Sequence, residues 1–351
     1  MAEEPSPLGP LDALTDVDGI RVGHARVPGE GALSGTTVVL APAGGAVAAV
    51  DVRGGGPGTR ETDALDPRNL VQRIDAVVLT GGSAYGLDAA SGVMAWLEER
   101  GRGVRVGPDP AHVVPVVPAA CLFDLGRGGD WRARPDAATG HAAVEAAAAS
   151  EPGAAVPEGT VGAGTGAVAG QLKGGVGTAS VRLASGATVA ALVVVNAAGS
   201  VVDPRTGVLY GEYGAGEPPA HPAPGVHEAA RLRLEELREA KGGGPFNTTI
   251  AVVATDAALT RAQAQKLAGT AHDGMARAVR PVHLLSDGDT VFALSTERLP
   301  LPPEPVAELN DILAAGADVL ARAIVKAVRA ARGVDGPGGA FPSYSDLYGT
   351  A

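Results

Sequence analysis

Short apolar runs rich in valine and alanine recur along this chain and alternate with stretches of helical periodicity. β-Branched residues suit the pleated surface of a sheet, and short apolar runs between turn residues are typical of buried strands. We predict strands at residues 37–40, 46–52, 76–80, 187–196, 249–254 and 291–295. Helices are predicted at about 87–101, 227–241 and 305–332, and after a capping box at 260–263. This mixture favours a layered α/β fold.

The composition indicates a globular protein that acts on a small molecule or a peptide. Of the 351 residues, 45% are hydrophobic and only 19% are charged, which argues against a disordered chain. The net charge of −11, without a basic stripe, argues against nucleic acid and anionic membranes as partners. With the single cysteine Cys121 and no histidine pair at metal-ligand spacing, we expect neither a metal nor another cofactor.

The sequence predicts a cytoplasmic protein with loose ends. The first twenty residues contain acids and prolines but neither the basic start nor the apolar core of a signal peptide, so we expect a cytoplasmic protein. No apolar run approaches the length of a transmembrane helix. Proline, glycine and serine are frequent at both ends, so we expect loose segments at about 1–10 and 333–351.

Thr248 stands where a glycine-rich breaker at residues 242–245 runs into a predicted strand. A threonine hydroxyl held against the carbonyl of the preceding residue, here Asn247, can attack it, convert the amide into an ester and release the preceding segment to water. The new chain then begins with Thr248, whose Oγ is a nucleophile and whose free α-amine is a general base. The alternative is a loop followed by an ordinary strand.

Three further places carry candidate chemistry. Asn196 ends the strand predicted at 187–196, where its side-chain amide can donate to an oxyanion or simply begin a turn. Asp287 and Asp289 precede the last predicted strand and share a face if the backbone is extended, although an Asp-Gly sequence is also a hairpin signal. Lys173 lies among glycines, either lining a cleft or solvated in a loop.

Taken together, these residues resemble the self-processing aminopeptidases and amidases of the DmpA type, which include endo-acting hydrolases of nylon oligomers. The resemblance covers most of the chain and rests on several motifs in the same order. They lie at residues 18–24, 53–59, 80–87, 162–166, 173–175, 195–197 and 247–250. The resemblance implies a four-layer αββα sandwich.

The resemblance also implies roles for individual residues. Thr248 matches the nucleophile that is exposed by cleavage after Asn247, and Asn196 matches the oxyanion-hole asparagine. Asp287 and Asp289 match a pair that supports the nucleophile and its amine in the nylon-oligomer branch. Lys173 matches an active-site lysine of that branch.

Cleavage after Asn247 would divide the chain into subunits 1–247 and 248–351. The resemblance implies that these stay together as one αββα domain in a homo-oligomer, for which we expect a tetramer. It implies a small peptide or a linear oligoamide as substrate.

This chain departs from the peptidase branch of the family in three respects. That branch commonly has a serine nucleophile and a Ser-x-Glu pair, and its large subunit contributes a tyrosine to the site, whereas this chain has no tyrosine between Tyr85 and Tyr210. The pattern therefore favours the branch with threonine and paired aspartates. Two other hypotheses remain open, an acyltransferase similar to ornithine acetyltransferases and an uncleaved ligand-binding protein.

Overall fold

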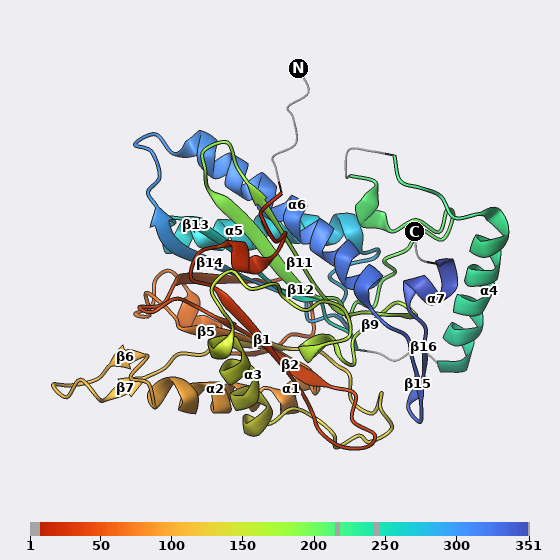
Figure 1. Ribbon diagram of the computed structural model, residues 1–351, viewed down its shortest axis with the longest axis horizontal. Helices are drawn as coiled ribbons and strands as arrows, with labels where there is room; N and C mark the ends of the chain where they lie inside the picture. Colours follow the sequence, from red (N-terminus) through yellow and green to blue (C-terminus); the bar gives the residue numbers. More distant parts are fainter. Residues whose placement is uncertain (1–7, 215–217, 242–245, 350–351) are drawn as a thin grey trace.

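Two five-stranded sheets stack face to face in the computed structural model, which describes residues 8–214, 218–241 and 246–349 (Figure 1). The first sheet has the order β1 (Arg21–Arg26), β2 (Gly35–Leu40), β5 (Ala76–Thr80), β8 (Ala119–Cys121) and β4 (Gly58–Arg60). The second has the order β11 (Val176–Arg182), β12 (Thr188–Val194), β13 (Ile250–Ala257), β14 (Thr290–Leu299) and β3 (Val47–Val52).

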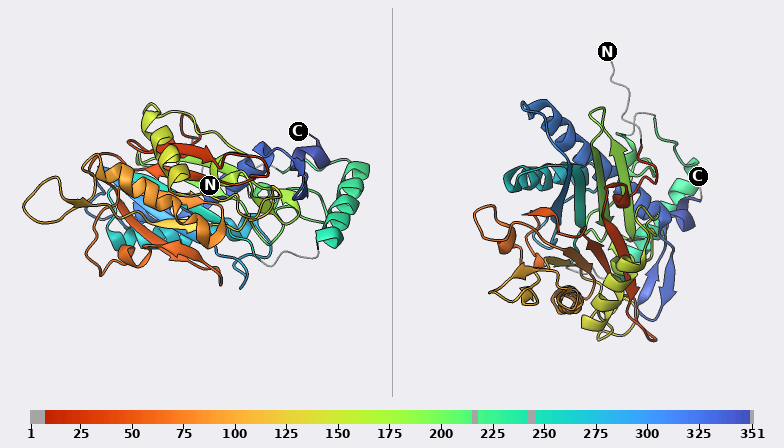
Figure 2. Two further views of the ribbon diagram at one scale, coloured as in Figure 1. Left: turned by 90° about the horizontal axis from the view of Figure 1, so that it is seen from below. Right: turned by 60° about the vertical axis from the view of Figure 1, so that its left-hand side comes forward.

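Helices cover the outer face of each sheet. α2 (Ala89–Glu98) and α3 (Ala137–Ala149) pack on the first sheet, while α5 (Arg261–Ala278) and α6 (Val306–Ala330) pack on the second. Figure 2 shows the same layering from two other sides. The four-layer αββα sandwich predicted from the resemblance is therefore confirmed.

The central strands of the second sheet are apolar on both faces because both faces are covered. In β12, Leu192 and Val194 point into the core between the sheets, whereas Ala191 and Val193 point toward α5 and α6. All four side chains are fully buried, and burial of each valine or leucine contributes about 1.5–3 kcal/mol. This is why β12 and β13 appear in the sequence as continuous apolar runs without alternation.

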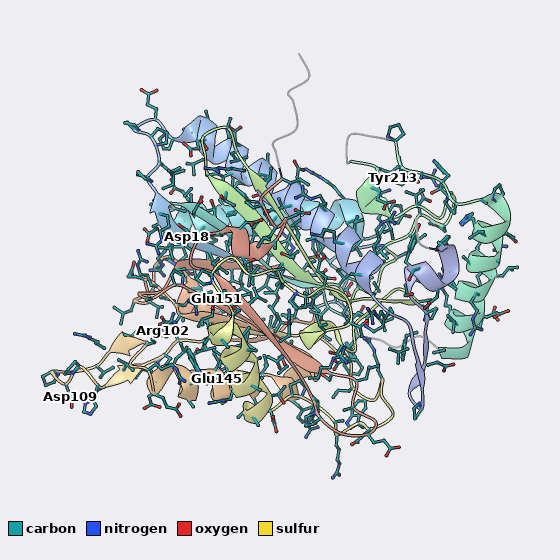
Figure 3. The ribbon with its side chains drawn as sticks, in the orientation of Figure 1. Asp18, Arg102, Asp109, Glu145, Glu151 and Tyr213 are labelled. Atoms are coloured by element: carbon teal, nitrogen blue, oxygen red, sulfur yellow. The ribbon has the colours of Figure 1, made fainter. Side chains whose placement is uncertain are left out.

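The remaining elements lie around the sandwich. Among them are α1 (Ser83–Gly86), α4 (Pro224–Lys241), α7 (Tyr344–Tyr348) and the short strand pairs β6 (Val104–Arg105) with β7 (Val113–Val114), β9 (Val168–Ala169) with β10 (Leu172–Lys173), and β15 (Val334–Gly336) with β16 (Gly339–Phe341). Asp109, between β6 and β7, lies at the opposite end of the molecule from α4 (Figure 3). Within the described ranges, no helix is both long and apolar enough to cross a membrane.

All six predicted strands and all four predicted helices are present, with ends shifted by a few residues. The capping box is confirmed, because Thr260 accepts from the backbone N–H of Gln263 and the Gln263 side chain accepts in return. The sequence analysis missed β1, β11 and the alanine-rich α3. Alanine carries too little hydrophobic contrast to mark one face of α3 against the other.

The prediction of a loose C-terminal end is wrong. Residues after 333 form the β15–β16 hairpin and α7, and the side chains of Phe341 and Tyr344 are buried. The Tyr344 hydroxyl donates to the Gly207 carbonyl at 2.9 Å. Pro337 and Gly338 form the turn between β15 and β16, and the anchoring aromatic residues Phe341 and Tyr344 follow it. At the other end, residues 1–7 lie outside the described residues, and Leu8 already pairs with β11.

Candidate active site

The candidate residues from three separate segments meet at one edge of the second sheet. β12 runs antiparallel to β13, and β13 runs parallel to β14. The end of β12 therefore lies beside the beginnings of β13 and β14, which places Asn196 beside Thr248 and the pair Asp287 and Asp289. All four side chains are buried, and that of Thr248 is 5% exposed. The glycine-rich breaker predicted at 242–245 lies outside the described residues.

The peptide bond between Asn247 and Thr248 is surrounded by hydrogen-bond partners. The Thr248 hydroxyl donates to the carbonyl oxygen of Asn247. The backbone N–H of Gly288 is 3.2 Å from that oxygen and 3.2 Å from Thr248 Oγ1. The N–H of Thr248 donates to the main-chain carbonyl of Asn196 at 2.6 Å. The hydroxyl, the carbonyl and a donor that can stabilise negative charge on its oxygen are thus in contact.

Gly288 can hold this position only as glycine. A Cβ there would lie 2.8 Å from Thr248 Oγ1 and 2.8 Å from the carbonyl oxygen of Gly56. The sequence analysis did not single out Gly288, because it considered the segment for its two aspartates and the glycine only as part of a turn signal. The hairpin alternative for 287–289 is wrong, since this segment runs beside Asn247 and both aspartates are buried.

The side-chain amide of Asn196 has a defined orientation. Its Oδ1 accepts from the N–H of Val168 at 3.0 Å and from the Arg127 guanidinium. Because both partners are donors, the oxygen must face them, and Nδ2 faces the carbonyl of Phe123 at 3.4 Å. In this uncleaved chain Asn196 contacts Thr248 through its main-chain carbonyl. Among the described residues, its Nδ2 makes only the one long hydrogen bond to Phe123.

Arg127 links the two asparagines of the site, and the sequence analysis missed it. One guanidinium nitrogen contacts Asn196 Oδ1 and the Gly166 carbonyl, the latter at 2.8 Å. The other donates to Asn247 Oδ1 at 2.9 Å. Arg127 lies in a loop after β8 and belongs to no motif, so only the folded chain reveals its partners.

The two aspartates support the backbone on either side of Thr248. Asp289 Oδ1 accepts from the N–H of Thr249 at 2.8 Å, and Asp287 Oδ1 accepts from the N–H of Ala198 at 3.1 Å. Burial, and then the neighbouring charge of Asp289, raise the pKa of Asp287 above its ordinary value. A carboxyl group with a raised pKa is suited to exchange a proton with an adjacent amine or hydroxyl.

His283 is a positioning residue for Asp289 that the sequence analysis did not single out. Its backbone N–H and its ring Nδ1 both contact Asp289 Oδ2, at 3.0 and 2.8 Å. The ring of His272 stands edge-on to it with centroids 4.8 Å apart and donates from Nε2 to the Asp51 carbonyl. Burial lowers the pKa of His272 to about 4, so this second ring is neutral near pH 7.

We expect His283→Gly to slow the chemistry at Thr248 about tenfold or more, because one hydrogen bond to a carboxylate is lost. Asparagine at position 283 is the matched control. Glycine and asparagine both tolerate the backbone φ of +58° found at position 283, but only the asparagine side chain keeps an N–H donor. His283→Asn should therefore retain most of the rate, as measured by the time course of chain cleavage. Equal rates for the two variants would exclude the positioning role.

Lys173 is fully buried in the strand pair β9–β10, which excludes the solvated loop alternative. Its Nζ donates to three main-chain carbonyls, those of Gly164, Ala167 and Gly174, at 2.7–2.8 Å. Burial, and then the charge of Arg127, lower the pKa of Lys173 well below its ordinary value. In the described residues the hydrogen-bond partners of Nζ are these carbonyls, so the side chain supports the glycine loops behind Asn196.

Replacing Lys173 by methionine is expected to lower the free energy of unfolding by about 3 kcal/mol or more. Methionine fills a similar volume but removes all three hydrogen bonds of Nζ, each worth about 1 kcal/mol. The carbonyls of Gly164 and Ala167 keep a backbone donor, whereas that of Gly174 loses its partner among the described residues. Urea unfolding followed by circular dichroism measures the loss. Lys266→Met, at an exposed lysine on α5, should change stability by no more than about 0.5 kcal/mol. Similar losses in both variants would contradict the structural role of Lys173.

The described part of the chain offers no metal site. It contains no group of three or more histidine, cysteine, aspartate or glutamate side chains placed to hold an ion. The groups that surround Thr248 are a hydroxyl, an amide carbonyl, backbone donors and carboxylates.

Known proteins that are similar to this chain are hydrolases of amide bonds by name. The model of peptidase family S58 matches residues 12–341. An uncharacterized aminopeptidase of Mycobacterium tuberculosis is 49% identical over 96% of this chain and 98% of its own length. A 6-aminohexanoate-oligomer endohydrolase of a Kocuria species is 33% identical over 83% of this chain and 76% of its own length.

Two solved structures share the fold. A β-aminopeptidase of a Burkholderia species superimposes with a TM-score of 0.72 over 98% of this chain and 94% of its own, at 24% identity. The L-aminopeptidase D-Ala-esterase/amidase of Ochrobactrum anthropi, described as a variant of the Ntn-hydrolase fold, has a TM-score of 0.72 over 99% and 97% of the two chains, at 22% identity.

Proposed function

The chain belongs to peptidase family S58 and is an amide hydrolase, and we propose that it cuts itself between Asn247 and Thr248 to generate an N-terminal threonine nucleophile. The observation that carries this proposal is the arrangement around one peptide bond. The Thr248 hydroxyl contacts the carbonyl of Asn247, and the N–H of Gly288 contacts both oxygens.

Self-cleavage proceeds in two steps. Thr248 Oγ attacks the carbonyl carbon of Asn247, its proton passes to the departing nitrogen, and the Gly288 N–H stabilises the oxyanion that forms meanwhile. The C–N bond breaks, which leaves Asn247 as an ester on Oγ and frees the α-amine of Thr248. Water then hydrolyses the ester and releases a carboxylate on Asn247 and the hydroxyl of Thr248.

In the cleaved enzyme the same groups act on external amides. The α-amine of Thr248 is the base that accepts the hydroxyl proton. The main-chain carbonyl of Asn196, which is 2.6 Å from the Thr248 nitrogen in the uncleaved chain, orients it. Asn196 Nδ2, aimed by Arg127, and the Gly288 N–H stabilise the oxyanion of the substrate. Asp287 takes part in holding the ammonium form of the amine.

The substrate proposed is a small peptide or a linear oligoamide, in line with the names of the relatives. The products of self-cleavage, residues 1–247 and 248–351, should stay together because β13 from the second fragment lies between β12 from the first and β14 from its own. We also propose that the paired fragments assemble into a homo-oligomer, a tetramer, in the cytoplasm.

Incubation of the purified protein with L-alanine p-nitroanilide and with linear 6-aminohexanoate oligomers tests the hydrolase. We expect release of p-nitroaniline or shorter oligomers at a rate that follows the fraction of cleaved chain. Acetylornithine with glutamate tests the acyltransferase hypothesis. Formation of acetylglutamate without hydrolysis of either amide would contradict the proposal and favour that alternative.

A further inference from the structure

The side chain of Asn247 occupies a specific polar site before any cleavage. Its Oδ1 accepts from the Arg127 guanidinium at 2.9 Å, and its Nδ2 donates to the carbonyl of Ala197 at 3.1 Å. Its backbone N–H donates to the carbonyl of Ser286 at 3.2 Å. A carboxamide satisfies both side-chain partners, because it offers one acceptor to the cation and one donor to the carbonyl.

The position of Asn247 also controls access to the nucleophile. In the uncleaved chain, where Phe246 and Asn247 are still attached, Thr248 is 5% exposed. Its hydroxyl is already hydrogen-bonded to the Asn247 carbonyl. An external amide can therefore reach Thr248 Oγ only after Asn247 has left. The space that opens is the one lined by Arg127, Ala197 and Ser286.

Two esters of Thr248 must form in the same surroundings. The self-cleavage ester joins Asn247 to Oγ, and the acyl-enzyme of a later turnover joins the acyl part of the substrate to the same Oγ. Both oxyanions need the N–H of Gly288, which is fixed beside Thr248. In both esters, the substituent on the acyl carbon must then extend toward the space lined by Arg127, Ala197 and Ser286.

From this geometry, and resting on the proposed function, we propose that the site holding Asn247 becomes the acyl subsite of the mature enzyme, selective for an asparaginyl residue within a peptide. The Arg127 guanidinium donates to the side-chain carbonyl of that residue, and the main-chain carbonyl of Ala197 accepts from its amide N–H. An aspartyl side chain would place a second carboxylate oxygen against the Ala197 carbonyl, and a leucyl side chain would leave the guanidinium unpaired.

An aromatic cluster extends this subsite toward the preceding residue. Phe246, which is 52% exposed, has its ring centroid 6.0 Å from that of Phe123, and Phe123 lies 6.1 Å from Trp131. A peptide that copies residues 246 and 247 would place its own phenylalanine on Phe123. Aromatic pairs at such distances attract each other beyond simple burial.

The probes are three p-nitroanilides that differ at one residue, acetyl-Phe-Asn, acetyl-Phe-Leu and acetyl-Phe-Asp. Leucine is nearly isosteric with asparagine, so the comparison isolates the hydrogen bonds. We expect kcat/KM for the asparaginyl probe to exceed that of each of the other two by about tenfold or more, since sites built around buried hydrogen bonds discriminate strongly. Equal or faster release from the leucyl probe would overturn the proposal.

The variant Arg127→Lys supplies a second readout. It keeps a cation but loses the planar fork that serves Asn196 and Asn247 together, so we expect the ratio of the asparaginyl to the leucyl rate to fall about fivefold or more. An unchanged ratio in a folded, cleaved variant would contradict the role of Arg127. If this variant does not fold, the comparison in the unmodified enzyme still decides.

A control amide separates failure of this inference from failure of the proposed function. Hydrolysis of L-alanine p-nitroanilide without any turnover of the asparaginyl probe would overturn the subsite and leave the hydrolase intact. No turnover of any amide by fully cleaved protein would overturn both.

Discussion

Thr248→Ala is expected to yield a chain that stays at 34.7 kDa and hydrolyses no amide above background. The substitution removes the only hydroxyl that contacts the Asn247 carbonyl among the described residues. It takes away both the group that attacks in self-cleavage and the nucleophile of later turnovers, so the two activities should disappear together. Mass spectrometry of the intact protein and p-nitroanilide release measure them separately.

Serine at position 248 is the matched control for this result. Thr248→Ser keeps the hydroxyl and removes one methyl group, so cleavage should continue, although more slowly because the serine rotamer is less restricted. Hydrolysis by an uncleaved Thr248→Ala chain would contradict the account, since another residue would then have to be the nucleophile.

Gly288→Ala has the second largest expected effect, a fall of about a hundredfold or more in the rate of self-cleavage. Its Cβ would lie 2.8 Å from Thr248 Oγ1, so the hydroxyl or the backbone donor must move. A displacement of about 1 Å at a reacting group commonly costs about a hundredfold. The fraction of cleaved chain over time, followed by denaturing electrophoresis, measures this rate.

Gly225→Ala serves as the control for a simple glycine effect. A Cβ at Gly225 meets no atom within 4 Å, and its backbone φ is not positive. Cleavage in this variant should proceed at the rate of the unmodified chain. Normal cleavage in folded Gly288→Ala protein would show that the Gly288 N–H and its neighbouring space are not needed.

The sequence predicted the layers well because the central strands are covered on both faces. β12 and β13 read as uninterrupted apolar runs for that reason, and their ends place Asn196 and Thr248 at one edge. The C-terminal end was misjudged because turn residues dominate its composition. The aromatic anchors Phe341 and Tyr344 that fix it carry no periodic pattern.

The candidate site was predictable only where residues follow the strand ends. Thr248, Asp287 and Asp289 stand beside apolar runs, which mark their place in the sheet. Arg127 and His283 come from loops, so their contacts with Asn247 and Asp289 depend on how the loops fold over the sheet edge. Gly288 acts through its backbone N–H, which every residue except proline possesses, so its sequence position carries no chemical signal.

The structure gives Lys173 a different role from the one that its place among glycines suggests. A lysine among glycines suggested a charge that lines a cleft, but the structure places its Nζ on three main-chain carbonyls. Because every residue has a backbone carbonyl, the sequence does not indicate which carbonyls a lysine will contact. A buried cation that organises loops therefore cannot be distinguished from a catalytic one until the fold is known.

The central claim is that the bond between Asn247 and Thr248 is the first amide that this enzyme opens. Intact-mass measurement of the purified protein, with N-terminal sequencing of the smaller product, tests it most directly. The account predicts two chains, residues 1–247 and 248–351, the second beginning Thr-Thr-Ile-Ala. A single 34.7 kDa chain that hydrolyses amides, or a new N-terminus at any other residue, would contradict it.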